Sequence, residues 1–251
     1  MSTESPSARQ FYDGFTGAFL RDYVRGNLRV DRQFRFLAEA ISPADRNILV
    51  IGCGIGHVGR FLAGKARCAH IVASDLSGEC IRLANRLFPH PRVEYRVLDA
   101  LCDPIDGAFD LVVLPDVYEH IPASSRGVLH ERLARVLGVR GRIALTGPTP
   151  GHQAMLRAGG GPLQPVDEDV TPEHLQTFAR DVGGALTFYR MISVWRTNDY
   201  FHAVIERGVE PVRELQASDR YPLKSGTGHC PLCDIVRRWW RRFRMAKAGL
   251  G

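Results

Sequence analysis

The stretch from Ile48 to Leu62 constrains the fold more than any other part of the chain. It reads ILVIGCGIGHVGRFL: a short apolar run, three glycines at alternating positions, and an apolar pattern with helical spacing. A short run that is apolar throughout predicts a strand buried on both faces. Glycines directly behind it predict a tight turn, at which the backbone can approach a ligand closely. The stretch therefore predicts a strand, a ligand-binding turn and a helix.

Strand-like and helix-like segments alternate after this turn. Further strands are predicted at 70–74, 92–98, 109–114 and 142–146, and helices at 58–63, 77–87 and 124–137. Such alternation predicts a doubly wound α/β fold, in which helices cover both faces of a mostly parallel sheet.

The remaining segments have other patterns. Residues 7–40 are rich in aromatic side chains and predict a mostly helical cover, whereas the Gly- and Pro-rich segment 147–170 predicts a loop. Thr171, followed by a proline, predicts the N-cap of another helix. The β-prone segments 185–195 and 199–206 predict a final hairpin-like pair of strands.

We therefore expect three parts in the chain. They are an N-terminal helical cover at 1–43, an α/β domain at 44–208, and a C-terminal linker with a basic amphipathic tail at 209–251.

The charge of the chain is concentrated in its tail. The net charge is +6, from 33 basic and 27 acidic residues, and segment 235–251 contains six basic residues and no acidic one. The remainder is neutral, so composition does not require a surface that binds nucleic acid. No apolar run approaches the roughly 20 residues of a membrane span, and the polar N-terminus resembles no signal peptide. The expected location is the cytoplasm.

The glycines fit two patterns that serve different cofactors. Gly54, Gly56 and Gly59 satisfy the dinucleotide pattern G-x-G-x-x-G, but the predicted strand ends at Ile51, so that Gly52 is already the first residue of the turn. In this register the glycines that allow close approach lie directly beside the strand end, without the spacing that binding of a pyrophosphate needs. Gly59 is then expected to allow close packing between the helix and the strand. Asp75, at the end of the next strand, suits ribose hydroxyls in either pattern.

Five motifs occur in order at the ends of successive predicted strands: ILVIGCGIG, VASDLS, VLDA, FDLVVLPDVYEHIP and GRIALTGP. On these motifs, residues 9–206 resemble the class I methyltransferases that depend on S-adenosyl-L-methionine (SAM). The resemblance implies a Rossmann-like sheet of seven strands, with the last two forming an antiparallel edge. It also implies SAM as the cofactor.

The resemblance assigns cofactor-binding roles to single residues. The backbone of Gly52, Cys53, Gly54 and Gly56 would approach the methionine part of SAM, and Asp75 would bind the ribose hydroxyls. Leu76, Asp99 and Ala100 would contact the adenine. Leu114 and Pro115 would flank the sulfonium. Relatives often carry an aromatic residue that closes over SAM at the position of Tyr12. The alternative for Tyr12 is ordinary packing in an amphipathic helix.

Methyl transfer to oxygen can need a general base. His120 is one candidate, and His152, in the segment after the fifth predicted strand, is another. Asp116, Glu119 and His120 would share a face of one helical turn. The segment resembles ubiquinone-pathway O-methyltransferases, which bind a divalent ion through two glutamates and a histidine. Because Asp116 replaces the first glutamate and no fourth ligand is evident, we predict no metal. A third reading is that these residues only shape the pocket.

Two features lie in the C-terminal part. The stretch DIVRRWWRRFRMAK predicts a basic amphipathic helix, for which an anionic membrane surface, docking on protein and contact with nucleic-acid phosphate are alternatives. The HCPLC stretch at 229–233 has the spacing of half a zinc site or of a redox pair, but no second Cys/His pair follows, and reduced thiols in a flexible linker are the favoured reading.

The sequence therefore predicts a SAM-dependent methyltransferase that acts on a small molecule in a biosynthetic pathway, at oxygen before other atoms. A lipid-linked acceptor and peripheral membrane contact through 235–247 are part of this prediction. The alternatives are an RNA or protein methyltransferase, a non-catalytic partner protein that keeps the fold and, more distantly, a dinucleotide oxidoreductase.

Overall fold

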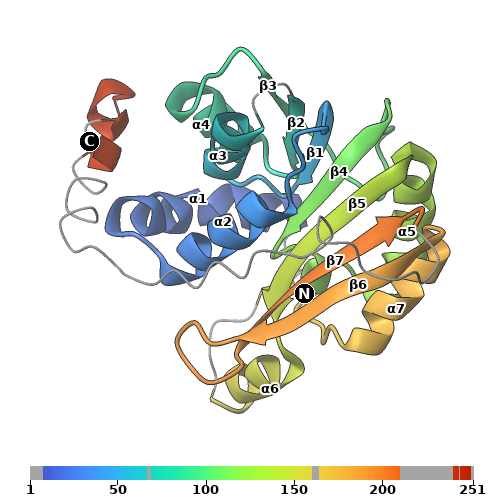
Figure 1. The fold of residues 1–251 in the computed structure, drawn as a ribbon. Coiled ribbons are helices and arrows are strands. Elements are labelled where there is room, and N and C mark those ends of the chain that lie inside the picture. The colour runs from blue at the N-terminus through green and yellow to red at the C-terminus, as the bar shows by residue number, and fades with distance from the viewer. Residues whose placement is uncertain (1–7, 67–68, 160–163, 210–239, 243, 250–251) are drawn as a thin grey trace, which may run out of the picture.

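The computed structural model describes residues 8–66, 69–159, 164–209, 240–242 and 244–249. These residues form one seven-stranded sheet in the order β3-β2-β1-β4-β5-β7-β6 (Figure 1). The strands are β1 Asn47–Ile51, β2 His70–Asp75, β3 Val93–Val97, β4 Phe109–Pro115, β5 Leu137–Pro148, β6 Gly184–Ile192 and β7 Tyr200–Arg207. Only β7 runs against the others, because it pairs antiparallel with both β5 and β6. The predicted α/β class and the final antiparallel pair are confirmed.

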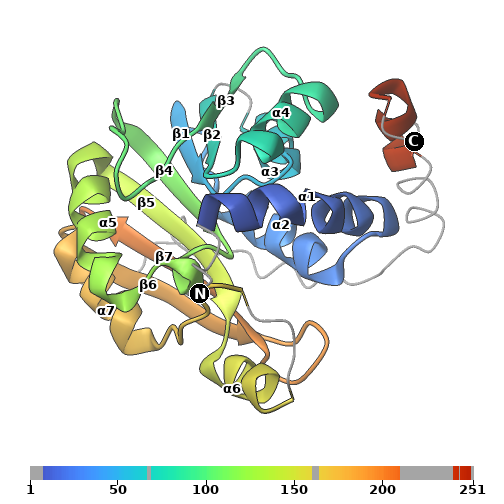
Figure 2. The same ribbon diagram turned by 180° about the vertical axis from the view of Figure 1, so that it is seen from behind.

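Helices cover both faces of the sheet (Figure 2). They are α1 Ala8–Arg25, α2 Leu28–Ala40, α3 His57–Lys65, α4 Gly78–Leu87, α5 Ala123–Val136, α6 Pro150–Ala158 and α7 Pro172–Asp181, with a 3-10 turn η1 at Tyr118–His120. Ser77 caps α4 by accepting from the backbone N–H of Cys80 at 3.0 Å. Thr171 caps α7 as its sequence predicts.

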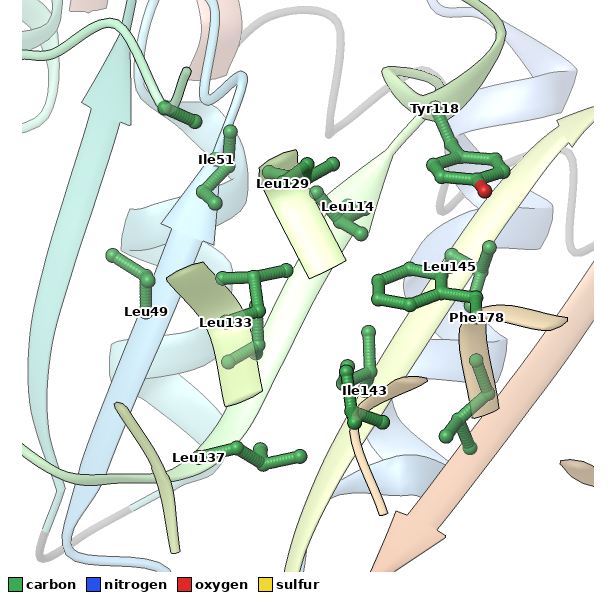
Figure 3. Packing of buried hydrophobic residues seen from close by; sticks show 14 of the residues in the cluster. Leu49, Ile51, Leu114, Tyr118, Leu129, Leu133, Leu137, Ile143, Leu145 and Phe178 are labelled. Carbon is green, nitrogen blue, oxygen red and sulfur yellow. The ribbon is translucent and has the colours of Figure 1, made fainter. Parts of the chain in front are cut away.

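Each sheet face has its own hydrophobic core, because side chains along a strand alternate between faces. On β1, Ile48 and Val50 pack toward α2, α3 and α4, whereas Leu49 and Ile51 pack toward the opposite face. Figure 3 shows this second core, in which Phe178 of α7 is fully buried with residues of α5 and the sheet. The two cores hold the strand ends rigidly at one edge of the sheet.

One predicted element is wrong. Residues 147–170 do not form a loop throughout, since α6 begins at Pro150 and is capped by Thr149. Thr149 followed by Pro150 is the same N-cap pattern that predicts α7, but the glycines near this helix favoured a loop in the sequence. The predicted N-terminal helical segment is present as two helices, which separate at Gly26, where φ is +82°. Asn27 then caps α2.

The described part of the C-terminal tail packs on the protein itself. Met245 and Ala248 lie against the core beneath α2, α3 and α4, and Arg86 at the end of α4 donates to the carbonyl oxygen of Ala248. Residues 229–233 and 235–239, with the HCPLC stretch and the start of the predicted tail helix, lie outside the described residues. No helix in the described ranges has the length and apolar character of a membrane span.

Candidate active site

A cavity of about 1050 Å³ opens at the carboxyl ends of β1, β2, β4 and β5, beneath α1 and α2. Ligands bind at this edge in open parallel sheets, because the strand order reverses there between β1 and β4. The volume exceeds the range of roughly 300–1,000 Å³ that is usual for one small ligand. The cavity therefore has room for a cofactor and a second molecule.

The three glycines after β1 have three different reasons to be glycine, although all have positive φ. At Gly52 a Cβ atom would lie 2.2 Å from Cγ2 of Val117, and at Gly56 it would lie 2.6 Å from Cβ of Ala84. At Gly54 a Cβ atom would meet nothing within 4 Å, and this residue lines the cavity. Gly54 is thus the place where the bare backbone faces open space.

Gly59 and Asp75 fix the elements around this turn. A Cβ atom at Gly59 would lie 3.1 Å from Cβ of Ala73, which agrees with packing of α3 on β2. The Asp75 carboxylate accepts from the backbone N–H of Gly54 at 2.8 Å and of Ser77 at 3.0 Å. Burial raises the pKa of Asp75, although these bonds oppose the shift. Asp75 therefore locks the turn and also lines the cavity.

Residues that follow β2 and β3 form the neighbouring wall. Leu76, Asp99 and Ala100 line the cavity with Leu98. The Asp99 carboxylate accepts from the backbone N–H of Leu101 at 2.9 Å, which folds the loop back on itself. This wall is mainly apolar, with one carboxylate beside it.

The loop after β4 begins with a strained residue. Asp116 has a φ of +56°, a region that is costly for a side chain other than glycine and that often marks functional sites. Its carboxylate pairs with Arg29 of α2 and accepts from the hydroxyl of Thr146 at 2.6 Å. Thr146 in turn accepts from Gln33 at 2.8 Å. This network ties α2 to the ends of β4 and β5.

Glu119 is buried and neutral at pH 7. The residue is 2% exposed, and Oε2 has no hydrogen-bond partner among the described residues. Burial raises the pKa of Glu119 to about 8, and the guanidinium of Arg29 opposes the shift. The side chain lines the cavity as a carboxylic acid, which can donate as well as accept a hydrogen bond.

His120 has the geometry of a general base. Its Nδ1 lies 2.8 Å from the carbonyl oxygen of Val166, and a carbonyl can only accept. In the neutral ring the proton is therefore assigned to Nδ1, and Nε2 carries the lone pair. Burial lowers the pKa of His120, so the neutral ring is the main form at pH 7. The ring lines the cavity.

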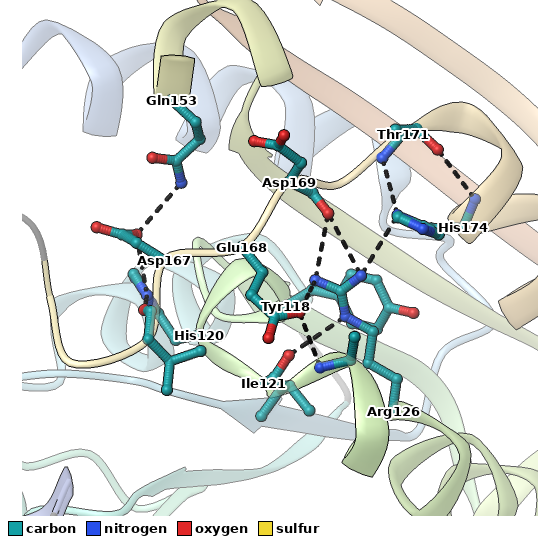
Figure 4. A network of polar contacts seen from close by, with 12 residues as sticks. Tyr118, His120, Ile121, Arg126, Gln153, Asp167, Glu168, Asp169, Thr171 and His174 are labelled. Carbon is teal, nitrogen blue, oxygen red and sulfur yellow. Dashed lines mark hydrogen bonds and ion pairs between the residues drawn. The ribbon is translucent and has the colours of Figure 1, made fainter. Parts of the chain in front are cut away.

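The turn that carries Glu119 and His120 is held from behind by Arg126 of α5 (Figure 4). The Arg126 guanidinium donates to the carbonyl oxygens of Ile121 and Asp169 at 3.3 Å each. It also lies over the ring of Tyr118, with its carbon 4.7 Å from the centroid. The rigid, planar fork of Arg suits several fixed partners at once. It therefore holds the turn and the segment before α7 together.

Tyr12 and His152 approach the same space from two other helices. The Tyr12 ring on α1 lies 6.3 Å from the His120 ring, and burial raises the pKa of Tyr12. The His152 ring on α6 lies 5.5 Å from the ring of Tyr200, and its Nδ1 is buried with no hydrogen-bond partner in the described part of the chain. Both histidines and Tyr12 thus line one pocket.

Known proteins share this arrangement. A family model described as "Methyltransferase domain" matches residues 48–141. The probable chloroplastic tocopherol O-methyltransferase of Oryza sativa subsp. japonica is 29% identical over 94% of this chain and 64% of that protein. The chloroplastic tocopherol O-methyltransferase of Arabidopsis thaliana is 31% identical over 67% of this chain and 50% of that protein.

A solved structure shows the same fold. The magnesium protoporphyrin IX methyltransferase of Synechocystis PCC 6803, with bound S-adenosylhomocysteine (SAH), has a TM-score of 0.62 and 19% identity, over 80% of this chain and 97% of that one. The chain contains a class I SAM-dependent methyltransferase domain. It spans only about half to just under two thirds of the length of the two tocopherol relatives. The activity of the whole protein is therefore a proposal.

The cavity of the methyltransferase domain fits SAM on its own geometry. Gly54 leaves open space for close approach, and Asp75 places a carboxylate at the end of β2. Leu76 and Leu98 give an apolar wall for the adenine ring. SAM supplies an activated methyl group on a sulfonium. The assignments of Gly52, Cys53, Gly54, Asp75, Leu76, Asp99, Ala100, Pro115 and Tyr12 stay predictions, and all nine residues line the cavity.

The assignments of Gly56 and Leu114 also stay predictions, although neither residue is among those that line the cavity. Gly56 instead allows the close approach of α4. Leu114 is fully buried in the core beneath α5 and α7, because alternation along β4 turns its side chain to that face.

Sequence reasoning missed Arg29 as a residue of the methyltransferase site. In the sequence it is one of several basic residues in an amphipathic segment, without a motif. Only its pairing with Asp116 shows that it faces the cavity. Among the described residues no cluster of His, Cys, Asp and Glu has the geometry of a metal site.

Proposed function

We propose that this protein transfers the methyl group of SAM to a hydroxyl oxygen of a small molecule in a biosynthetic pathway. The observation that carries the proposal is the orientation of His120, whose Nε2 is left as the basic atom in the cavity wall because Nδ1 donates to Val166. The proposal agrees with the tocopherol relatives, which are named O-methyltransferases.

The reaction needs little more than position and a base. When His120 Nε2 takes the acceptor's hydroxyl proton, an oxygen lone pair forms the new bond to the methyl carbon. The pair of the broken carbon–sulfur bond returns to sulfur, which leaves a neutral thioether. Glu119, as the neutral acid, adds no negative charge beside the developing oxyanion.

The second half of the cavity supports a small acceptor with an apolar body. Leu156, Val166, Trp195 and Tyr200 line it together with His152. An interior pocket of this kind admits a ring or a chain more readily than a folded RNA or protein surface. A lipid-linked acceptor fits these walls.

The functional test uses SAM labelled in its methyl group and a panel of phenols with and without an apolar side chain. Mass spectrometry of the products is expected to show a labelled methyl ether with at least one phenol. In a His120→Gln variant its formation is expected to fall, whereas His90→Gln, in the half-buried turn before β3 and outside the cavity, is expected to leave it unchanged. Label that enters RNA or protein but no phenol would overturn the proposal in favour of those acceptors.

Peripheral membrane contact through residues 235–247 and a cytoplasmic location stay predictions. Among the described tail residues, Trp240 is 57% exposed, whereas Arg241 and Arg244 face the cavity. Sedimentation with liposomes, for the full chain and for a chain that ends at Asp234, tests the contact. Equal partitioning of the two chains would remove it.

A further inference from the structure

The cavity has a third region, beyond those of the cofactor and the acceptor, which the methyl-transfer reaction does not use. We call it the aromatic chamber, and Tyr23, Phe34, His57, Phe61 and Phe88 line it. The rings of Phe34 and Phe61 stack with centroids 4.3 Å apart, and those of Tyr23 and Phe88 meet edge to face at 5.2 Å. These side chains come from α1, α2, α3 and the end of α4.

The aromatic chamber is far from the reacting groups. Tyr12 lies beside His120, and Tyr23 lies in the chamber, on the same helix α1. With a rise of 1.5 Å per residue, their separation of eleven positions along α1 corresponds to roughly 16 Å. The described residues 240–242 and 244–247 are helical, and we call them the C-terminal helix. Both ribbon views place this helix next to the turn between α1 and α2, on the side away from α6 (Figures 1 and 2).

Cations surround the mouth of the chamber. Arg60 and Lys65 of α3 line it together with Arg241 and Arg244 of the C-terminal helix, against one lining carboxylate, Asp22. The guanidinium of Arg241 lies 5.5 Å from the ring centroid of Tyr23, and that of Arg244 lies 5.2 Å from that of Phe88. Arg241 Nη2 is 3.9 Å from a carboxylate oxygen of Asp31. The mouth of the chamber is positive.

His57 places a polar atom inside the chamber. Its Nδ1 is buried with no hydrogen-bond partner in the described ranges, and its ring lies 5.5 Å from that of Phe34. Burial lowers the pKa of His57 to about 4, and the cations Arg29 and Arg241 add to the shift. A neutral, buried and unpartnered nitrogen in an apolar space indicates a ligand that reaches it.

We propose that the aromatic chamber binds an amphipathic anion, whose apolar chain or ring lies among the aromatic side chains and whose phosphate or carboxylate meets Arg241 and Arg244. The apolar walls favour a hydrocarbon body, and the paired guanidinium groups favour a phosphate or carboxylate head. The site is distinct from that of SAM and of the methyl acceptor. It gives the C-terminal helix a role, because this helix brings both arginines to the chamber.

The test uses decyl phosphate as the probe, titrated calorimetrically into the full chain saturated with SAH. We expect saturable binding that weakens at least tenfold in an Arg241→Gln/Arg244→Gln variant. Arg242→Gln/Lys247→Gln removes the same charge from two exposed positions of the same helix outside the cavity, and it is expected to change the affinity less than twofold. Unchanged affinity in the Arg241→Gln/Arg244→Gln variant would overturn the proposal, as would inorganic phosphate binding as tightly as decyl phosphate.

A second variant guards against undocking of the C-terminal helix. Val30→Trp keeps every charge and fills the chamber one helical turn from Phe34 on α2, and it is expected to abolish the binding of decyl phosphate. Retained binding would overturn the proposal. Displacement of SAH by decyl phosphate would overturn it too, since the chamber would then belong to the cofactor.

Two further measurements distinguish a membrane lipid from a soluble ligand, and the chamber proposal from the proposed function. Sedimentation with phosphatidylglycerol but not phosphatidylcholine vesicles, lost in the Arg241→Gln/Arg244→Gln variant, would support a membrane lipid as the source. Binding of monomeric decyl phosphate alone would support a soluble one. SAH affinity and methyl transfer are measured in parallel: their failure sinks the proposed function, whereas failure of decyl phosphate alone sinks only the chamber.

Discussion

The cofactor end and the acceptor end of the cavity differ in how they are built. At the cofactor end, the turn at Gly54 is held by backbone N–H groups that donate to Asp75, all within one strand–turn–helix unit and its neighbour. At the acceptor end, Glu119, His120 and His152 are side chains from separate segments, and residues near 166 complete the wall. A site made of backbone follows from local sequence, but a site made of side chains depends on how distant segments pack.

The largest expected effect tests the acceptor end. His120→Gln removes the base but keeps a group that can bond to Val166, so methyl transfer to the best phenol is expected to fall about 10²–10⁴-fold. That fall corresponds to about 3–5 kcal/mol in activation free energy. Initial rates measure it, while unchanged thermal unfolding serves as the control for folding. A rate within threefold of the parent would show that this end needs no base.

The next effect separates two roles within the cofactor end. Gly56→Ala places a Cβ atom 2.6 Å from Ala84 at a φ of +95°, so we expect a loss of about 3 kcal/mol in the free energy of unfolding. Gly54→Ala, at a φ of +53° with open space, is expected to cost about 1 kcal/mol but to weaken SAH binding much more. Urea unfolding and calorimetry measure both. Equal losses of stability in the two variants would contradict the assignment of a packing role to Gly56 and a ligand-facing role to Gly54.

A smaller effect concerns the charge of Glu119. Its folded-state pKa is about 8, above the ordinary value of 4.5, so its contribution to stability is complete below about pH 4.5 and is lost as the pH rises through 8. Glu119→Gln stays neutral and escapes this loss. At pH 8.5 the variant is expected to be more stable than the parent protein, whereas below pH 4.5 the two are expected to be alike. Parallel pH profiles of the two proteins would refute the assignment.

The smallest effect concerns the link between α1 and the cofactor end. The Asp13 carboxylate accepts from the hydroxyl of Ser77 at 2.5 Å and from the backbone N–H of Glu79 at 3.3 Å, at the start of α4. Asp13→Ala is expected to cost about 1 kcal/mol. Glu39→Ala, on the exposed side of α2, is the matched control and is expected to have little effect. Equal losses in the two variants would show that α1 is not held through Asp13.

Local chemistry made much of the fold predictable. The order of strands and helices, the cap at Ser77 and the strand–turn–helix unit at Gly52 depend on neighbouring residues, so a single sequence contains them. The helix α6 obeys the same rule through Thr149, but the surrounding glycines outweighed that signal in the sequence.

Tertiary structure alone decided how the site residues divide their roles. Whether Gly56 faces a ligand or α4, and whether Leu114 faces the cavity or the core, depends on which elements lie beside them. The pairing of Arg29 with Asp116 joins α2 to the loop after β4, and the pKa of Glu119 follows from its burial. Conformational preferences act between near neighbours and are encoded locally. Burial and close approach arise between distant segments, so they exist only once the chain has folded.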